Sequence, residues 1–365
     1  MAEILVAMSG GVDSSVAAAL LVDQGHDVVG VTLKLWGGES DSGCCSVSDV
    51  EDARRVAQQL DIDHHVFNFG DEFDEFVVDP YVAAHEDGLT PNPCVECNRH
   101  IKFDKLFRRA DALGFDLVAT GHHAQVAETG DRDEAVFRIR RGADAQKDQS
   151  YVLHMLGQGQ LRRLILPVGA ITKEQVRELA VELDLRTADK PDSQDVCFIH
   201  SKGGRQQFLG DRISLKPAKL VDTDGVEVGS VSSVELVTIG QRRGLNLGGD
   251  AGRRYVVDID RRNSHVVVGE RSELLTKDLL VNNVEWSNHP EVGAVAVQCS
   301  AHGATRKAVL SVGQTTSEGD ESNDKSVLVT WAQPQPKVAV GQSVVFYDGD
   351  DVLGGGIAGQ KNPST

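Results

Sequence analysis

Two groups of residues in this 365-residue chain have types and spacings that can do chemistry. The first is the stretch SGGVDSS, from Ser9 to Ser15. Its glycines let backbone N–H groups approach an anion closely and its hydroxyls add donors, which suits a phosphate or pyrophosphate group. The second is a set of thiols, above all Cys94 and Cys97 in a C-x-x-C and the distant Cys197. Thiolates act as nucleophiles, redox groups and metal ligands.

The SGGVDSS stretch lies between two patterns that can position it. The apolar run from Glu3 to Met8 predicts a β-strand, and the alanine-rich run from Val16 to Val22 predicts a helix. A helix start supplies free N–H groups and the positive end of its dipole. An ordinary strand-to-helix turn would have the same order. Asp13 favours a binding site, because a carboxylate beside a phosphate needs a metal ion or another polarised partner.

The type of phosphate loop can be narrowed further. It is not a Walker loop, because no Gly-Lys-Ser/Thr follows the glycines. The stretch instead resembles the pyrophosphate loop (PP-loop) of the ATP pyrophosphatase superfamily. That resemblance implies cleavage of ATP between its α and β phosphates and adenylation of an oxygen atom.

Length and composition bound the class of protein. A chain of 365 residues predicts two or three domains. No apolar stretch approaches the ~20 residues of a membrane span, and no basic region followed by an apolar segment stands at the start. We therefore expect a cytoplasmic protein without a membrane partner. The net charge of −18 argues against a general nucleic-acid coat protein, although a local basic patch can still bind RNA.

Clusters of basic residues and the cysteines are the other candidate functional groups. Basic clusters occur from Arg99 to Arg109, from Arg138 to Arg141 and at Arg242-Arg243, and each one alone is more simply a solvated face. The chain has six cysteines. In a reducing cytosol, metal-binding, redox or catalytic roles are more natural for them than a static disulfide framework.

The first half of the chain alternates strands with helices. Strands are predicted over 27–35, 65–68 and 116–120, and helices over 47–60, 71–85 and 101–113. Pro91 and Pro93 predict a rigid loop before the last helix. This order predicts a doubly wound, mostly parallel α/β sheet whose ligands bind beyond the carboxyl ends of the strands. We expect SGGVDSS, the loop with Cys44 and Cys45, and Gly121-His122 at one rim.

The middle of the chain carries four further local patterns. Residues 135–141 alternate and predict an edge strand with one basic face. Lys147 to Tyr151 predicts a helix start, and 173–183 predicts a helix. Lys190 to Ile199 predicts a polar loop that enters a short strand.

Beyond about residue 205 the chain changes to short alternating segments. Strands are predicted over 219–221, 234–239, 254–259 and 265–268, and then over 294–299, 308–312, 326–331 and 343–347. Thr315 to Lys325 predicts a mobile acidic loop. We expect a PP-loop catalytic domain over 1–205, a small central β-rich domain over 206–277 and a C-terminal β-barrel over 278–365.

The C-x-x-C is ambiguous by itself. Cys94 and Cys97 are compatible with half of a zinc ribbon, a redox pair, cluster ligands or chance. A structural zinc site needs four ligands, and the chain has no second C-x-x-C. Arg99, His100 and Lys102 form an electropositive setting that favours a thiolate. Cys197 could converge on the same rim.

Seven blocks together resemble the tRNA-specific 2-thiouridylase family, in the right order and over nearly the whole chain. They are SGGVDSS, TPNPCVECN with IKF, ATGHHA, KDQSY, DSQDVCFI, TIGQRRGLNLGG and GQSVVFYDGDDVLGGGI. The resemblance implies ATP- and Mg²⁺-dependent conversion of the wobble uridine (U34) of certain tRNAs to 2-thiouridine. It implies a persulfide donor, either a cysteine desulfurase or a sulfur carrier protein. We expect a monomer.

The resemblance also implies the site residues. For ATP they are Ala7, Met8, Ser9, Gly10, Gly11, Val12, Asp13, Ser14, Leu33 and Gly121, with Asp13 near the magnesium-bound phosphates. For tRNA they are Asn92 and Pro93, which would line the flipped target base, and His122, Lys147, Asp148, Gln149 and Gln342, the last in the barrel. Cys97 and Cys197 match the catalytic pair, which forms a transient disulfide, and Cys197 matches the cysteine that carries the persulfide.

The residue types fit this chemistry. A uridine C2 oxygen is a poor leaving group, and adenylation by ATP turns it into AMP. A persulfide sulfur on Cys197 then attacks C2, and Cys97 resolves the intermediate by thiol–disulfide exchange. The target base must leave its stack, at a cost of a few kcal/mol.

Two positions depart from the family pattern. Cys94 stands where the family often has an aspartate proposed as an acid/base group. Gln298-Cys299-Ser300 occupies the strand in which the family's barrel often carries an Arg-Tyr pair for tRNA. Cys299 itself is more simply a buried small hydrophobe.

Three alternatives stay open. Cys94, Cys97 and Cys197 could hold a [4Fe-4S] cluster whose open iron binds a sulfide; we favour the persulfide route. An adenylating ligase or amidotransferase acting on a small molecule would need neither catalytic cysteine. A non-catalytic RNA-binding module would not depend on ATP.

Overall fold

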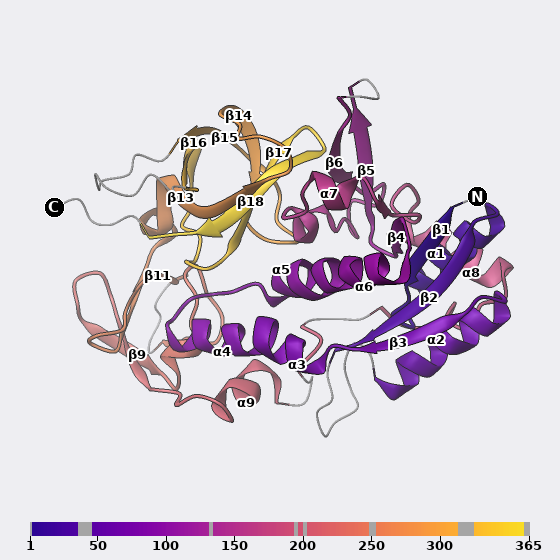
Figure 1. Ribbon diagram of the computed structural model, residues 1–365. Helices are drawn as coiled ribbons and strands as arrows, with labels where there is room; N and C mark the ends of the chain where they lie inside the picture. Colours follow the sequence, from indigo (N-terminus) through magenta and orange to yellow (C-terminus); the bar gives the residue numbers. More distant parts are fainter. Residues whose placement is uncertain are drawn as a thin grey trace.

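The computed structural model describes residues 2–35, 46–130, 134–192, 196–199, 203–247, 253–312 and 325–360. Cys44 and Cys45 lie outside these described residues, as does nearly all of the predicted acidic loop from Thr315 to Lys325. The described chain forms a parallel sheet, a small central sheet and a large barrel sheet. Figure 1 shows the parallel sheet at the N-terminal side, the barrel at upper left and the central sheet below the barrel.

The N-terminal sheet is parallel and covered by helices on both faces. Its strands run in the order β3-β2-β1-β4-β7. They are β1 (Glu3–Ala7), β2 (Asp27–Lys34), β3 (His64–Asn68), β4 (Leu117–Thr120) and β7 (Leu164–Ile165). Each pair is parallel. The predicted doubly wound α/β sheet is therefore confirmed.

Alternate residues of β1 define the two faces of this sheet. Ile4 and Val6 belong to one apolar core, which includes side chains of α1 (Val12–Asp23), α2 (Val47–Gln59) and α8 (Lys173–Glu182). Leu5 belongs to the other core, on the face covered by the remaining helices. This alternation follows from the period of two along a strand.

The second face is covered by two long helices, each with a π-helical middle. The first runs through α3 (Gly70–Phe73), η1 (Asp74–Val78) and α4 (Asp79–Glu86), as the pattern over 71–85 predicted. The second runs through α5 (Pro93–Glu96), η2 (Cys97–Lys105) and α6 (Leu106–Leu113). Figure 1 shows the two lying side by side.

The start of the second long helix corrects a prediction. The stretch from Thr90 to Asn98 was expected to be a rigid loop, with the helix beginning near Ile101. The helix instead begins at Pro93, because proline is favoured at the first helical position, where its missing N–H costs nothing. The side chain of Asn92 caps it by accepting a hydrogen bond from the Cys94 N–H at 3.1 Å. Both cysteines of the C-x-x-C are therefore helical.

Three shorter predictions are also wrong. Lys147 to Tyr151 leads into a single 3₁₀ turn, η3 (Ser150–Leu153), which precedes the short helix α7 (Gln158–Leu161). Val196 to Ile199 forms a turn rather than a strand. Val234–Leu236 is a 3₁₀ turn, η4, where a strand was predicted. Each of these sequence patterns is short, and tertiary packing overrode its local structural preference.

The central sheet has the order β10-β9-β8-β12-β11. Its strands are β8 (Ala218–Val221), β9 (Glu227–Val231), β10 (Asn246–Leu247), β11 (Tyr255–Asp260) and β12 (His265–Gly269). The helix α9 (Gly204–Gly210) precedes it, and the 3₁₀ turn η5 (Arg271–Leu274) leads onward. The small central β-rich unit is as predicted.

The C-terminal sheet closes into a barrel. Its strands are β13 (Leu275–Trp286), β14 (Gly293–Gln298), β15 (Arg306–Val312), β16 (Val327–Pro336), β17 (Ser343–Asp348) and β18 (Asp351–Ala358). Pairing of β13 with β18 closes the ring, which confirms the predicted barrel. The sequence analysis missed β13 and β18. In β18 the glycines hide the strand pattern, and a Cβ at Gly354 would lie 2.3 Å from the Glu285 carbonyl oxygen.

The hairpin of β5 (Ala124–Thr129) and β6 (Val136–Arg141) joins the catalytic half to the barrel. β6 was predicted to be an edge strand, but it lies between β5 and β18 in the barrel sheet. Its basic face is used internally, because Arg138 pairs with Glu291 and Arg140 with Asp351, both at 2.6 Å. In Figure 1 the hairpin stands between the parallel sheet and the barrel.

Candidate active site

The SGGVDSS stretch forms a preorganised turn between β1 and α1. Gly10 has φ +73°, and a Cβ there would lie 2.2 Å from the Asp49 carbonyl oxygen, so only glycine fits. Ser14 Oγ accepts from the Ser9 N–H and donates to the Gly11 carbonyl oxygen, both at 3.1 Å. Ser15 Oγ donates to the same carbonyl at 2.8 Å. These bonds hold the loop in place at the start of a helix, where anions bind.

Gly121 lies directly against this loop. A Cβ at Gly121 would come within 2.6 Å of the Ser14 nitrogen. The end of β4 and the loop after β1 therefore meet at the carboxyl rim of the sheet, as predicted. Leu33, which with Gly121 was expected to contact ATP from outside the loop, is buried near the end of the neighbouring strand β2.

The Asp13 carboxylate accepts hydrogen bonds from two side chains that lie far from it in sequence. The Lys173 ammonium donates to both carboxylate oxygens at 2.7 Å, and His123 Nε2 donates to Oδ1 at 2.9 Å. Burial alone would raise the pKa of Asp13, but the hydrogen bonds from His123 and Lys173 outweigh it and hold the pKa below its usual value. Asp13 is therefore a carboxylate at neutral pH.

Lys173 is a site residue that the sequence analysis missed. Its side chain is 10% exposed and also pairs with Asp192 at 2.9 Å. It stands at the start of a predicted helix, where a lysine carries no special signal. Its ammonium is held between two carboxylates, one of which belongs to the phosphate loop.

His122 and His123 are neighbours in sequence but make different contacts, and no role was predicted for His123. His122 is buried, bonded to Thr120 Oγ1 at 2.7 Å and tilted against the Phe103 ring. Burial, together with the charge of Lys102, lowers the pKa of His122 to about 3, so it is neutral. His123 is the one that reaches Asp13. Contact of His122 with tRNA stays a prediction.

The two cysteines that were expected to be catalytic border one core, although a hundred residues separate them in sequence. Cys97 is 7% exposed and belongs to the core on the second face of the sheet. Cys197 is partly buried and packs against the same core. Its neighbour Phe198 anchors this turn with ring centroids 5.7 Å from Phe73 and 5.4 Å from Tyr81. Neither of these two cysteines forms a disulfide.

Cys94 and Cys97, the two cysteines of the C-x-x-C, differ in solvent exposure. It is exposed, whereas Cys97 one helical turn later is buried. Within the described ranges no three histidine, cysteine or acidic side chains gather as a metal site. The described geometry therefore gives no support to a cluster held by Cys94, Cys97 and Cys197.

The residues expected to contact tRNA are engaged in internal contacts. Lys147 pairs with Asp192 at 2.7 Å, and Asp148 pairs with Arg141 at 2.5 Å. Gln149 accepts from the His123 N–H at 2.8 Å. Gln342 Nε2 donates to the Thr90 carbonyl oxygen at 3.0 Å and so ties the barrel to the chain just before Asn92 and Pro93. Their contacts with tRNA stay predictions.

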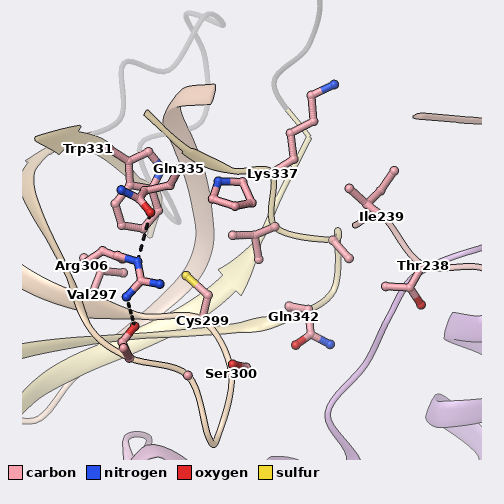
Figure 2. A pocket seen from close by; sticks show the side chains of 15 residues that line it. Thr238, Ile239, Val297, Cys299, Ser300, Arg306, Trp331, Gln335, Lys337 and Gln342 are labelled. Atoms are coloured by element: carbon pink, nitrogen blue, oxygen red, sulfur yellow. Dashed lines mark hydrogen bonds between the residues drawn. The ribbon is translucent and has the colours of Figure 1, made fainter. Parts of the chain in front are cut away.

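A cavity of about 370 Å³ lies between the central sheet and the barrel. Figure 2 shows Gln342 at its edge, with Arg306 and Cys299 on the barrel side and Thr238 on the opposite side. Arg306 Nε donates to Gln335 Oε1 at 3.0 Å. Burial raises the pKa of Cys299 to about 12, so this thiol stays protonated and chemically quiet, in keeping with the role expected of it.

A parallel α/β sheet with a serine–glycine pyrophosphate loop at its carboxyl rim defines an ATP-using protein of the PP-loop class. Three family models match the chain: "tRNA methyl transferase HUP domain" over residues 2–201, "tRNA methyl transferase PRC-barrel domain" over 206–270, and "Aminomethyltransferase beta-barrel domain" over 276–358. The domain boundaries expected at 205 and 277 stay predictions.

Similar curated proteins narrow the class to a family. The tRNA-specific 2-thiouridylase MnmA of Carboxydothermus hydrogenoformans is 44% identical over 366 residues, with 97% of this chain and 96% of the relative covered. MnmA of Chloroflexus aurantiacus is 44% identical, covering 98% of each chain, and that of Clostridium botulinum is 38% identical, covering 97% of each. The chain belongs to the tRNA-specific 2-thiouridylase (MnmA) family. The predicted enzyme class, a tRNA-uridine 2-sulfurtransferase, is confirmed.

Two of the solved structures that are similar to part of this chain are enzymes named for tRNA or RNA thiolation. A 4-thiouridine synthetase in complex with RNA and ATP aligns with a TM-score of 0.38 and 17% identity, covering 54% of this chain and 45% of that one. The U34-tRNA thiolase NcsA of Methanococcus maripaludis aligns with a TM-score of 0.37 and 18% identity, covering 57% of this chain and 63% of that one.

Among the described residues, no helix is long and apolar enough to span a membrane.

Proposed function

We propose that this protein converts the wobble uridine of tRNA to 2-thiouridine by adenylating the C2 oxygen and then transferring a persulfide sulfur from Cys197. The observation that carries this proposal is the arrangement of the sheet. A preformed pyrophosphate loop stands at its carboxyl rim, and the core on one of its faces contains Cys97 and packs against Cys197. Adenylation chemistry and sulfur chemistry can therefore serve one substrate.

The loop residues fit a magnesium–ATP complex. N–H groups at the start of α1 bind phosphate oxygens, and Lys173 adds a cation. The ionised Asp13 side chain is 31% exposed and supplies the hard oxygen ligands that Mg²⁺ prefers. A magnesium ion there would neutralise phosphate charge. The uridine O2 attacks the α-phosphate, and pyrophosphate leaves.

The cysteines then complete the substitution at C2. The terminal sulfur of the Cys197 persulfide attacks C2 and AMP leaves with the former O2, which joins tRNA to Cys197 through two sulfurs. The Cys97 thiolate attacks Cys197 Sγ, and the 2-thiouridine sulfur departs with the electron pair. The product is thiolated tRNA and a Cys97–Cys197 disulfide, which a dithiol reductant resets.

The partners follow from this reaction. tRNA is the substrate, gripped by Lys147, Asp148, Gln149 and Gln342, with the target base flipped out against Asn92 and Pro93. The sulfur comes from a persulfide-bearing protein, a cysteine desulfurase or a carrier. We propose that the enzyme works as a monomer in the cytoplasm.

The test is mass analysis of nucleosides from tRNA incubated with the protein, ATP, Mg²⁺ and a persulfide source. The wild type and the control variant Cys299→Ser should yield 2-thiouridine. Cys197→Ala should yield none and still bind ATP. A Cys197→Ala enzyme that thiolates tRNA at the wild-type rate would overturn the proposal.

The same preparation separates the persulfide route from an iron–sulfur route. Iron and acid-labile sulfide are assayed after anaerobic purification, and Cys94→Ser is compared with the wild type. An iron-free protein that thiolates tRNA at full rate, with Cys94→Ser equally active, supports the persulfide route. Strict dependence of activity on iron and on Cys94 would establish the cluster instead.

A further inference from the structure

Cys94 is an exposed thiol that the proposed reaction leaves without a role. It stands one helical turn before Cys97, and the Cys97 N–H donates to the carbonyl oxygens of Cys94 and Pro93, so the turn between the two cysteines is closed. Residues three apart on a helix share a face, and their Cα atoms are about 5 Å apart. That separation lies inside the usual range for a disulfide.

The position of this C-x-x-C in its helix suits thiol chemistry. The pair lies in the first turn of the long helix that begins at Pro93 and continues to Leu113. The first N–H groups of a helix have no partner in a preceding turn, so a small movement there breaks few backbone bonds. The positive end of the helix dipole also favours thiolates, the reactive form in disulfide exchange.

Cys94 also lies near the turn that carries Cys197. Burial raises the pKa of Tyr81, and a negative charge on Cys94 adds to that rise against the opposing charge of Arg205. Cys94 and Tyr81 are therefore close in space. The Tyr81 ring packs on Phe198, the residue after Cys197, with ring centroids 5.4 Å apart. The three cysteines thus border one region of the fold.

The three cysteines differ in solvent exposure, and this gives an exchange between them a direction. Cys94 is exposed, Cys197 is partly buried and Cys97 is 7% exposed. The proposed reaction ends with a disulfide between Cys97 and Cys197. An external thiol would have to enter the core to attack Cys97. A disulfide between Cys94 and Cys97 presents one of its sulfur atoms on the surface instead.

We propose that Cys94 is a catalytic residue that resets the enzyme after each turnover. Its thiolate attacks Cys97 Sγ, the Cys97–Cys197 bond breaks, and Cys197 leaves with the electron pair as a thiolate that can accept the next persulfide sulfur. One thiolate of a dithiol reductant then attacks Cys94 Sγ and Cys97 leaves as a thiolate. The second thiol of the reductant closes its own disulfide and releases Cys94.

This inference rests on the proposed function for the disulfide between Cys97 and Cys197. The test is disulfide mapping after one turnover. Enzyme carrying a persulfide is separated from its donor and mixed with tRNA, ATP and Mg²⁺ without reductant. It is then quenched with acid, alkylated with N-ethylmaleimide and analysed by peptide mass spectrometry without reduction, while the tRNA is digested to nucleosides.

The wild type should contain mainly the Cys94–Cys97 disulfide, with Cys197 alkylated, and Cys94→Ser should contain the Cys97–Cys197 disulfide. A wild type that makes 2-thiouridine and keeps the Cys97–Cys197 disulfide, with Cys94 alkylated, overturns the role of Cys94 alone. If no 2-thiouridine forms, the proposed function itself fails. The wild-type map needs no variant, so it decides the question even if Cys94→Ser does not fold.

Turnover kinetics separate a reset from support of the fold. Cys94→Ser should complete its first turnover at the wild-type rate. Later turnovers at limiting dithiothreitol should slow at least about tenfold, because a positioned intramolecular thiol has a high effective concentration. Excess dithiothreitol should restore them.

The matched control is Cys299→Ser, which should follow the wild type at both concentrations of dithiothreitol. A Cys94→Ser enzyme that already loses its first turnover, as removal of a structural or cluster-binding residue would cause, contradicts the proposal. Later turnovers equal to those of the wild type at limiting dithiothreitol contradict it as well.

Discussion

Gly121→Ala offers a sharp test of the nucleotide site, because one methyl group would enter the contact between β4 and the phosphate loop. The added Cβ would lie 2.6 Å from the Ser14 nitrogen and 2.7 Å from the Asp13 carbonyl carbon. Both neighbours are backbone atoms, so no side chain can turn aside. Ordinary contact begins at 3.4 Å, so the loop must retreat by about 0.8 Å.

The size of the effect follows from that displacement. Overpacking of this kind costs about 1–3 kcal/mol of stability. A misplacement of about 1 Å in a catalytic arrangement can lower the rate about a hundredfold. The retreat moves Asp13 and the N–H groups at the start of α1, which the phosphates must contact. We therefore expect kcat/KM for AMP formation to fall about a hundredfold.

The assays are ATP binding by calorimetry and AMP formation in the presence of tRNA. Gly159→Ala is the matched control, since Gly159 is exposed in helix α7 and a Cβ there has no neighbour within 4 Å. The control should bind ATP as the wild type does. If Gly121→Ala bound ATP with unchanged affinity and formed AMP at the wild-type rate, the inferred contact between β4 and the loop would be wrong.

Three further outcomes are expected. Arg141→Met leaves the buried Asp148 without its guanidinium and should cost about 3 kcal/mol, seen as a lower midpoint of urea unfolding. Burial lowers the pKa of His154 to about 4, so the unfolded chain binds the proton first and stability falls as pH drops from 6.5 to 4; His154→Gln should make the fall of the unfolding midpoint between pH 7 and 5 less steep, while the other buried histidines keep part of it. Cys299, with its pKa raised to about 12, should react with iodoacetamide at pH 8 about a hundredfold more slowly than the exposed Cys94, and equal rates would contradict its burial.

The parts of the site that could be read from the sequence are those set by neighbouring residues. The turn at Gly10 needs a positive φ, which glycine alone adopts freely, so SGGVDSS predicts its own shape. The strand before it and the helix after it follow from apolar patterns a few residues long. Gly121 was placed correctly because the carboxyl ends of parallel strands meet at one rim.

Other elements were mispredicted because the local signal had two interpretations. Pro93 was taken as a breaker, whereas at the first turn of a helix it is favourable. The arginines of β6 were predicted to form an exposed basic face. In the structure they form ion pairs with Glu291 and Asp351 of the barrel and with Asp148 of the chain before η3. Docking of the barrel against the hairpin is what brings Glu291 and Asp351 to these arginines.

By itself the sequence determined the alternation of strands and helices from β1 to β4, the phosphate loop and the identity of the thiols, because backbone preference and side-chain chemistry are written in contiguous residues. Tertiary structure alone decided which charges meet. Lys173 reaches Asp13 across 160 residues, and Asp192 joins Lys173 and Lys147 from a third segment. Ion pairing depends on distance in space, and a pattern along the chain carries no information about that distance until the sheet has brought the segments together.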